Sequence, residues 1–245
     1  MIYLIQKKTD VVPFVDKGIP VINFEDLGNG AKYANLVINE LYDKPINKLR
    51  NTLWGNSYFF VRDEFKNLKP SNFRVIIKNI LLTFGGTDSL SLSEKIYVAI
   101  RDICHDNKIK ISIVTGPGYQ KYQSLLKKIK NDKNCTLTHD TGVISRIMKK
   151  SDLAITSNGR TVFELAHMNV PTIVISQHQR ETTHKFTNNQ NGFISLGQYK
   201  RNSTQKKLIH NLLKIINKKE IKKNLYSAMS RFDFNNKNKI IDILS

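Results

Sequence analysis

The sequence predicts an α/β protein with a parallel sheet. Between Phe73 and Phe232, short apolar segments alternate with amphipathic helical ones, a pattern typical of parallel strands that are covered by helices on both faces. Two of the apolar segments, 79–84 and 152–156, lead through glycine turns into helical segments. Such junctions are the places where doubly wound sheets bind ligands. The sequence therefore predicts a Rossmann-like domain over residues 73–232.

The expected elements of this domain follow its periodicity. The strands are expected at 79–84, 109–115, 134–138, 152–156, 171–176 and 193–196. The helices are expected at 90–104, 119–130, 141–150, 160–168, 180–189, 204–217 and 219–230.

Residues 1–72 predict only a partial Rossmann-like half. Strands are expected at the start of the chain (Met1 to Gln6), at 19–24 and at 35–39. Residues 41–72 lose the periodicity, and long loops inside compact domains are usually functional or linking. Residues 233–245 are expected to form a C-terminal helix and tail.

The charge of the chain is strongly positive. Lys and Arg number 39 and Asp and Glu 20, which gives a net charge of +19. A partner rich in phosphate would explain this excess. Compositional drift explains it equally simply and is favoured, because the lysines are scattered and no nucleic-acid-binding module accompanies them. We expect no nucleic-acid partner, while the basic surface leaves room for peripheral contact with an anionic membrane.

The two cysteines, Cys104 and Cys135, indicate a cytoplasmic protein with reduced thiols. They lie far apart and at no metal-ligand spacing. No apolar run approaches the roughly 18 residues that a membrane span needs. We expect no cofactor.

The first glycine junction reads Asn79-Ile-Leu-Leu-Thr-Phe-Gly-Gly-Thr-Asp88. Gly85 and Gly86 let backbone N–H groups approach an anion closely, and Thr87 adds a hydroxyl donor. The positive end of the following helix dipole favours phosphate. Alternatively, Asp88 or the serine after it caps that helix. The motif is not the six-residue dinucleotide fingerprint.

The second junction reads Asp152-Leu-Ala-Ile-Thr-Ser-Asn-Gly-Arg-Thr-Val-Phe-Glu164. Its turn, Ser157-Asn158-Gly159-Arg160-Thr161, can offer N–H groups to a diphosphate. Thr161 and Glu164 have the spacing of a capping box, in which Glu164 reaches back to the Thr161 backbone N–H. Alternatively, the Glu164 carboxylate accepts hydrogen bonds from the ribose hydroxyls of a nucleotide. The two interpretations are compatible.

A third polar segment, Gln177-His-Gln-Arg-Glu-Thr-Thr-His184, follows the strand that ends at Ser176. His184 can transfer protons or bind sugar hydroxyls, although a lone histidine on an amphipathic helix is more often structural. Arg180 can pair with phosphate or with Glu181. The other histidines have no partners at metal-ligand spacing, so we expect no metal site. They are His105, His139, His167 and His210.

Three motifs in sequence order resemble a known family. They are Leu81-Leu-Thr-Phe-Gly-Gly-Thr-Asp88, Asp152-Leu-Ala-Ile-Thr-Ser-Asn-Gly-Arg-Thr-Val-Phe-Glu-Leu-Ala166 and Val170-Pro-Thr-Ile-Val-Ile-Ser176. Their order is similar to that in the PseG-type UDP-sugar hydrolases of pseudaminic acid synthesis. These hydrolases are similar in turn to glycosyltransferases of the GT-B fold, which has two Rossmann-like domains. The resemblance covers most of the chain and is strongest from Leu81 to His184.

The resemblance implies a GT-B-like chain with a complete C-terminal Rossmann-like domain and a partial N-terminal one. It implies that Gly85–Asp88 lies beside the diphosphate of UDP, and that Ser157–Thr161 and Glu164 hold phosphate and ribose. The residues expected on the sugar side are Tyr58, Arg62, His178, Gln179 and His184.

The chain departs from this family at two places. His178 stands where the hydrolase has Asn in an Asn-Gln pair. The family also begins with a Gly-x-Gly-His turn, whose His is assigned as the catalytic base, and this chain lacks that turn. Proton transfer contributes about a hundred- to ten-thousand-fold in rate. We therefore expect a fragment of a longer reading frame, a chain that has lost catalysis, or a partner chain that supplies the N-terminal half.

The leading hypothesis is a UDP-sugar-binding protein of surface polysaccharide or nonulosonic acid biosynthesis. Its ancestral reaction would be hydrolysis of a UDP-sugar with release of UDP. The alternatives are a glycosyltransferase that uses a UDP-sugar donor and a non-catalytic nucleotide-binding module.

Overall fold

The computed structural model describes residues 5–244 and divides the chain into two compact units. Unit 1 contains the described residues of 1–60, 184–186 and 234–245, and unit 2 contains 61–183 and 187–233. The expected boundaries lay after residues 72 and 232, whereas the structure groups 61–72 with the larger unit. Of the expected first strand, Met1 to Leu4 lie outside the described residues, and Ile5 and Gln6 form no strand.

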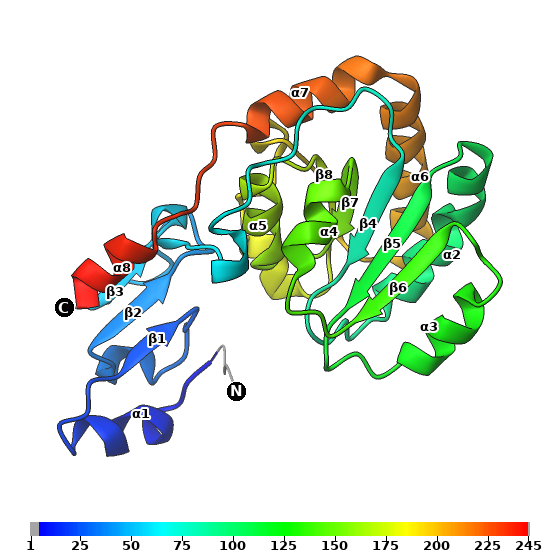
Figure 1. The fold of residues 1–245 in the computed structure, drawn as a ribbon. Helices are drawn as coiled ribbons and strands as arrows, with labels where there is room; N and C mark the ends of the chain where they lie inside the picture. The colour runs from blue at the N-terminus through cyan, green and yellow to red at the C-terminus, as the bar shows by residue number, and fades with distance from the viewer. Residues whose placement is uncertain (1–4, 245) are drawn as a thin grey trace. The chain divides into compact units, whose positions relative to one another are not determined.

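Unit 1 contains a small parallel sheet in the order β1-β2-β3 (Figure 1). Its strands are β1 (Ile22–Phe24), β2 (Leu36–Asn39) and β3 (Thr52–Trp54). Its helices are α1 (Lys8–Val15) and α8 (Lys237–Leu244), and 3₁₀ turns cover Ala31–Tyr33 and Asn56–Tyr58. Strand β3 was not expected, because three residues are too few to show a period.

The turn after β1 is held by a buried carboxylate. Asp26 is fully buried and accepts hydrogen bonds from the backbone N–H groups of Gln6 and Gly28, at 2.9 and 2.8 Å. It also accepts from the Asn23 side chain at 2.8 Å. Three donors offset the cost of removing this charge from water. This carboxylate therefore anchors the turn after β1.

Unit 2 is built on a six-stranded parallel sheet in the order β6-β5-β4-β7-β8-β9. The strands are β4 (Asn79–Thr83), β5 (Lys110–Thr115), β6 (Cys135–His139), β7 (Leu153–Thr156), β8 (Thr172–Ser176) and β9 (Phe193–Gln198). All six expected strands are present within one or two residues of their predicted ends. The α/β class and the parallel sheet are confirmed.

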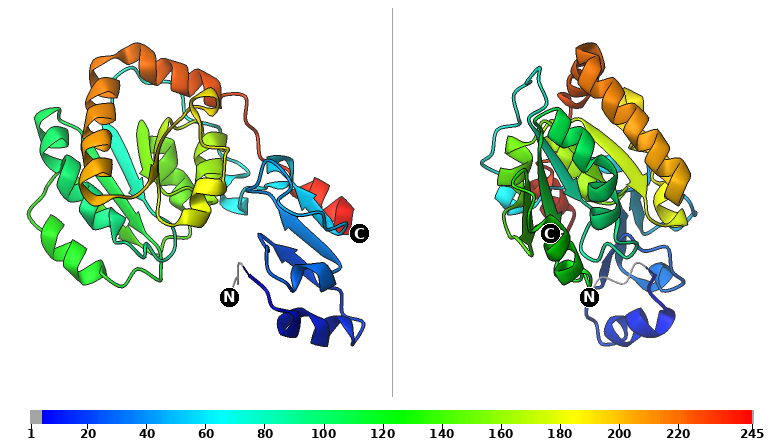
Figure 2. Two further views of the ribbon diagram at one scale, coloured as in Figure 1. Left: turned by 180° about the vertical axis from the view of Figure 1, so that it is seen from behind. Right: turned by 90° about the vertical axis from the view of Figure 1, so that its right-hand side faces the viewer.

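Helices cover both faces of this sheet (Figures 1 and 2). They are α2 (Leu92–Asp106), α3 (Tyr122–Ile129), α4 (Ile144–Lys150), α5 (Thr161–His167), α6 (Arg201–Asn217) and α7 (Lys219–Met229). Buried side chains of α2, α3 and α6 form one apolar core with β4, β5 and β7. Helices α4 and α5 lie on the opposite face. None of the helices described here is long and apolar enough to cross a membrane.

The helix expected at 180–189 is wrong. The structure has a 3₁₀ turn at Gln179–Thr183 and another at Asn189–Asn191. The hydroxyls of Thr182 and Thr183 donate to the backbone oxygens of Gln179 and Arg180, at 2.7 and 2.6 Å. Side chains that bond to nearby backbone in this way compete with the α-helical ladder.

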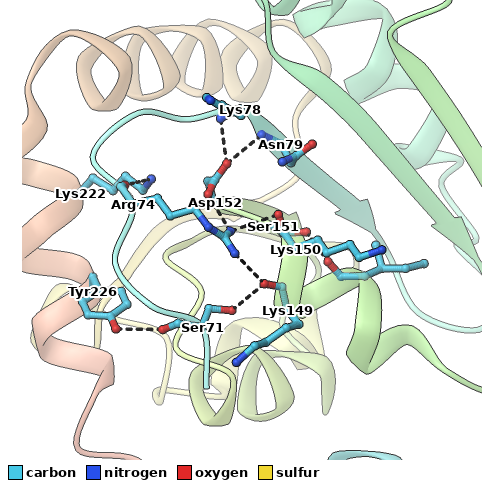
Figure 3. Close-up of polar contacts among 11 residues, drawn as sticks. Ser71, Arg74, Lys78, Asn79, Lys149, Lys150, Ser151, Asp152, Lys222 and Tyr226 are labelled. Carbon is cyan, nitrogen blue, oxygen red and sulfur yellow. Dashed lines mark hydrogen bonds and ion pairs between the residues drawn. The ribbon is translucent and has the colours of Figure 1, made fainter. Parts of the chain in front are cut away.

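A polar network fixes the starts of β4 and β7 (Figure 3). The Asp152 carboxylate is almost fully buried and accepts hydrogen bonds from the backbone N–H groups of Lys78 and Asn79, at 2.8 and 2.9 Å. It also forms an ion pair with Arg74, whose Nη1 lies 2.9 Å from Oδ1. The Arg74 guanidinium donates in turn to the backbone oxygen of Lys149 at 3.2 Å. Asp152 thus ties the chain entering β4 to the start of β7.

Lys222 of α7 is buried beside this network. It is 2% exposed, and its Nζ donates to the Arg74 backbone oxygen at 2.6 Å. Burial lowers the pKa of Lys222 to about 8, because desolvation disfavours the ammonium, while Asp152 opposes the shift. On the same helix, the Tyr226 hydroxyl donates to the Ser71 backbone oxygen at 2.8 Å. Helix α7 is therefore joined to the segment that leads into β4.

Replacing Lys222 by Met is expected to remove a pH dependence of stability. The folded pKa of about 8 lies below the ordinary value of 10.5, so between these values the unfolded state binds more protons and the free energy of unfolding rises with pH. The shift corresponds to roughly 3 kcal/mol over the whole window. Urea denaturation at several values between about pH 7.5 and 10 should show a steeper rise for the natural chain than for Lys222→Met.

The control is Lys223→Met, which changes an exposed lysine on the same helix. The two thiols also contribute to the pH dependence in this range, because they ionise at lower pH in the unfolded state than in the folded one. Comparison between variants cancels their contribution. Equal slopes for the natural chain and Lys222→Met would contradict a desolvated ammonium.

Candidate functional site

The two glycine turns predicted from the sequence follow neighbouring strands of unit 2. β4 and β7 are paired in parallel, with Thr83 opposite Thr156. The strand order reverses between them, because β5 and β6 lie on one side and β8 and β9 on the other. Doubly wound sheets bind ligands at the carboxyl ends of the strands at such a switch point. The sheet thus places both turns at the position that favours a ligand.

The first turn is packed against a glycine loop that the sequence analysis missed. Gly85 has φ +78°, a left-handed conformation that favours glycine. A Cβ added to Gly116 would lie 2.5 Å from the Gly86 Cα, so the two loops touch through their backbones. The Gly118 N–H donates to the Gly86 oxygen at 3.0 Å. The sequence Thr115-Gly-Pro-Gly118, at the end of an apolar strand, could have predicted this loop, because glycine and proline together mark turns.

The Asp88 side chain caps the following helix, as one of the two interpretations predicted, although the N-cap residue of α2 is Ser91. The Asp88 Oδ1 accepts the Leu92 N–H at 2.7 Å and its Oδ2 accepts the Ser93 N–H at 2.8 Å. The side chain is buried, and burial raises the pKa of Asp88 while the bonds from Ser93 and Leu92 oppose this. Both oxygens are thus engaged within unit 2. Direct contact of Asp88 with a diphosphate stays a prediction, and the exposed groups of this turn are Gly86 and Thr87.

The capping box predicted for the second turn is wrong. Helix α5 begins at Thr161, its N-cap is Arg160, and no side chain caps it. Thr161 is therefore the first helical residue rather than the cap, and the spacing to Glu164 no longer fits a box. Ser157 and Asn158 are buried at the end of β7, while Gly159, Arg160 and Thr161 are partly exposed.

Glu164 is paired with Arg62 instead. The Arg62 Nε lies 2.8 Å from Glu164 Oε1, and the Glu164 side chain is 8% exposed. Burial raises the pKa of Glu164, and the Arg62 guanidinium opposes the shift. Arg62 also lies 3.0 Å from Glu64 Oε1, and the second oxygen of Glu64 accepts the Ser145 N–H at 2.9 Å. Two residues predicted to act in one site, 102 positions apart, are thus in contact.

The second carboxylate oxygen of Glu164, Oε2, differs from Oε1 in its hydrogen bonding. Within the described part of the chain, only Oε1 receives a hydrogen bond. A carboxylate with one oxygen fixed by a guanidinium and the other available as an acceptor suits a hydroxyl-bearing ligand. This geometry is compatible with the ribose interpretation.

The segment after β8 also reaches the first turn. The Gln177 Nε2 donates to the Phe84 backbone oxygen at 2.9 Å. His178 is exposed, and its Nε2 lies 3.2 Å from the Ser89 Oγ. Gln179 is exposed at the start of the 3₁₀ turn. The loops after β4 and β8 are therefore joined, which the sequence did not reveal.

Two residues expected on the sugar side belong to unit 1. The Tyr58 ring lies 4.4 Å from Lys239 Nζ. His184 is buried and packs edge-on against Tyr42, with the ring centroids 5.0 Å apart. Their assignment to a sugar site stays a prediction.

His167, His139 and the two thiols have structural surroundings, whereas His105 and His210 are exposed. His167 is buried, 3.4 Å from Asp233, and burial lowers its pKa. His139 Nδ1 lies 2.9 Å from the Thr115 hydroxyl. Burial raises the pKa of Cys104 and Cys135 to about 12, so both thiols are unreactive at neutral pH. The described residues contain no His, Cys, Asp or Glu group that could hold a metal ion.

Comparison with known proteins establishes the family. Residues 79–244 match the family described as glycosyltransferase family 28 C-terminal domain. The chain belongs to this family. An uncharacterized protein of Methanocaldococcus jannaschii is 28% identical over 60% of the chain, and the spore coat polysaccharide biosynthesis protein SpsG of Bacillus subtilis is 24% identical over 72%. The matches span 33% and 55% of these two relatives.

Solved structures show the same fold at low sequence identity. MurG of Acinetobacter baumannii is 17% identical, with a TM-score of 0.58 over 95% of this chain and 68% of MurG. The spinosyn rhamnosyltransferase SpnG, solved with thymidine diphosphate, is 10% identical, with a TM-score of 0.61 over 97% of this chain and 70% of SpnG. These likenesses confirm the GT-B-like fold and the Rossmann-like C-terminal domain.

Replacing Asp88 by Ala is expected to destabilise the family 28 domain by about 1–2 kcal/mol, the upper part of the range for an N-cap, because two buried N–H groups lose their acceptor. Urea denaturation measures this. Asp106→Ala removes an exposed acid from the other end of α2 and should have little effect. Equal stabilities for Asp88→Ala and the natural chain would show that the cap is dispensable.

Proposed function

We propose that this chain binds a UDP-sugar at the carboxyl ends of β4 and β7. The observation that carries the proposal is the pair of glycine turns that flanks the switch point, with the buried Glu164 carboxylate at the second turn. The exposed backbone of Gly86 and Thr87 and the partly exposed Gly159–Thr161 would contact the diphosphate. Glu164 would accept hydrogen bonds from the ribose hydroxyls through its second oxygen.

The remaining predicted residues take supporting or sugar-side roles in this proposal. Arg62 holds Glu164 in place. His178 and Gln179 are exposed at the end of β8 and would face the sugar. Asp88 acts through the helix cap, because a second anion beside the diphosphate would be repelled.

Three comparisons support this class of ligand. The family is one of glycosyltransferases. TarM of S. aureus was solved with UDP, and SpnG was solved with thymidine diphosphate. TarM is 15% identical to this chain, with a TM-score of 0.58 over 87% of this chain and 44% of TarM. SpsG is named for spore coat polysaccharide biosynthesis. These comparisons support a role in surface polysaccharide biosynthesis, and we propose nonulosonic acid synthesis as the specific pathway because of the sequence motifs.

The proposed reaction is the release of UDP from a UDP-sugar. In hydrolysis, a water oxygen bonds to the sugar carbon, the bond to the diphosphate oxygen breaks, and UDP leaves with the electron pair while a base accepts the proton. In glycosyl transfer, an acceptor hydroxyl takes the place of water. Family membership favours transfer, and the motif resemblance favours hydrolysis.

Calorimetric titration of the full chain with UDP tests the binding site. The natural chain should bind UDP, and Glu164→Ala should bind it about ten- to a hundred-fold more weakly, because hydrogen bonds to a charged group are lost. Glu220→Ala, which removes an exposed carboxylate from α7, is the matched control. Unchanged affinity in Glu164→Ala would refute the ribose assignment. Salt-dependent binding of single-stranded DNA without UDP binding would favour a nucleic-acid partner instead.

Release of UDP from a UDP-sugar, measured with and without a glycan or lipid acceptor, separates the two reactions. Hydrolysis predicts release without an acceptor, and transfer predicts release that depends on one. Binding without release in either case would identify a non-catalytic nucleotide-binding module.

A further inference from the structure

Glu181 directs its carboxylate towards the backbone of two strand ends. Its Oε2 accepts the Gln177 N–H at 2.7 Å and the Asn158 N–H at 3.3 Å. Its own backbone oxygen accepts the Asn158 Nδ2 at 2.7 Å. The two bonds to Asn158 join the turn after β7 to the loop after β8, and the bond from Gln177 lies within that loop.

The connection extends to the first glycine turn. Gln177, whose N–H is held by Glu181, donates through its side chain to the Phe84 oxygen at 2.9 Å. On the other side, Asn158 Oδ1 accepts from the Thr187 hydroxyl at 3.0 Å. The ends of β4, β7 and β8 are thus linked by side chains that centre on Gln177 and Glu181. Backbone pairing alone would not fix the turns beyond the last residue of each strand.

The Glu181 carboxylate also occupies N–H groups at the place where an anion is expected to bind. A second negative charge in direct contact with a diphosphate would be repelled, so Glu181 suits an indirect role. The carboxylate does not bond to the partly exposed residues of the turn, which begin at Gly159.

We propose that Glu181 is a positioning residue for the nucleotide site, which holds the turns after β4, β7 and β8 in the geometry that receives the diphosphate. This inference rests on the proposed function. It adds that affinity for the nucleotide depends on a carboxylate that does not contact the nucleotide.

The charges around Glu181 allow a pH test. Burial raises the pKa of Glu181, whereas the N–H bonds and the nearby His178 and Arg180 oppose the shift. The turns after β4 and β7 carry Asp88 and Arg160, both of which every variant below retains. Protonation of Glu181 weakens its acceptor oxygen, so affinity for UDP should fall as the pH is lowered towards the carboxylate range.

The experiment is calorimetric titration of the full chain with UDP between about pH 5 and 8. Glu181→Gln should weaken binding about three- to ten-fold near neutral pH, and Glu181→Ala about ten- to a hundred-fold, since charge-assisted hydrogen bonds are lost. In both variants the fall in affinity on acidification should be smaller than in the natural chain. Titration of UDP itself is common to all chains. Glu220→Gln, an exposed carboxylate on α7, should behave like the natural chain.

Hydrogen exchange measured by mass spectrometry provides a second measurement that needs no ligand. Peptides covering 157–161 and 177–183 should exchange faster in Glu181→Ala, while peptides from α6 should not change. A loss of thermal stability with unchanged UDP affinity and an unchanged pH profile would overturn the positioning role. Unchanged exchange in the two loops would overturn it as well. If the natural chain fails to bind UDP, both the proposed function and this inference are refuted. If Glu181→Ala binds UDP as tightly as the natural chain does, only this inference is refuted.

Discussion

The parallel pairing of β4 with β7 is the constraint on which the site depends. It places two strands that are about seventy residues apart in the sequence next to each other, with Thr83 opposite Thr156, and it is the point where the order of strands reverses. Since parallel strands end at the same edge of a sheet, both glycine turns emerge together. The Asp88 cap follows β4, and Glu164, which pairs with Arg62, follows β7.

Two carboxylates hold the ends of these strands, and Asp152 is buried whereas Glu181 is partly buried. At the start, Asp152 accepts from the backbone entering β4 and pairs with Arg74. At the carboxyl end, Glu181 accepts from Asn158 and Gln177. A charge removed from water, wholly or in part, is costly unless donors surround it, so each carboxylate restricts the backbone to arrangements that supply those donors. The same requirement that stabilises the fold thereby fixes the turns where a nucleotide would bind.

Local pattern predicted much of this architecture. The apolar segments that form β4, β7 and β8 predicted strands close to their observed limits, because buried parallel strands are short and largely apolar. The helix at 180–189 failed because Thr182, Thr183 and Glu181 bond to nearby backbone, which periodicity does not report. The capping box predicted at Thr161 is wrong because the N-cap is Arg160, one residue earlier. The start of this helix depends on how the preceding strand ends. The Glu164–Arg62 pair spans 102 positions and could not be read from spacing.

The sequence by itself determined the α/β class, the parallel strands of unit 2 and the two glycine turns, and it offered Asp88 as one of two candidate caps. Each of these depends on residues close together in the chain, where glycine conformation, apolar periodicity and side-chain capping act locally. Only the tertiary structure decided which turns are neighbours, that Glu164 bonds to Arg62, and that Glu181 joins three loops. These contacts link distant segments, and their free energy arises from desolvation and charge pairing that exist only after the sheet has formed.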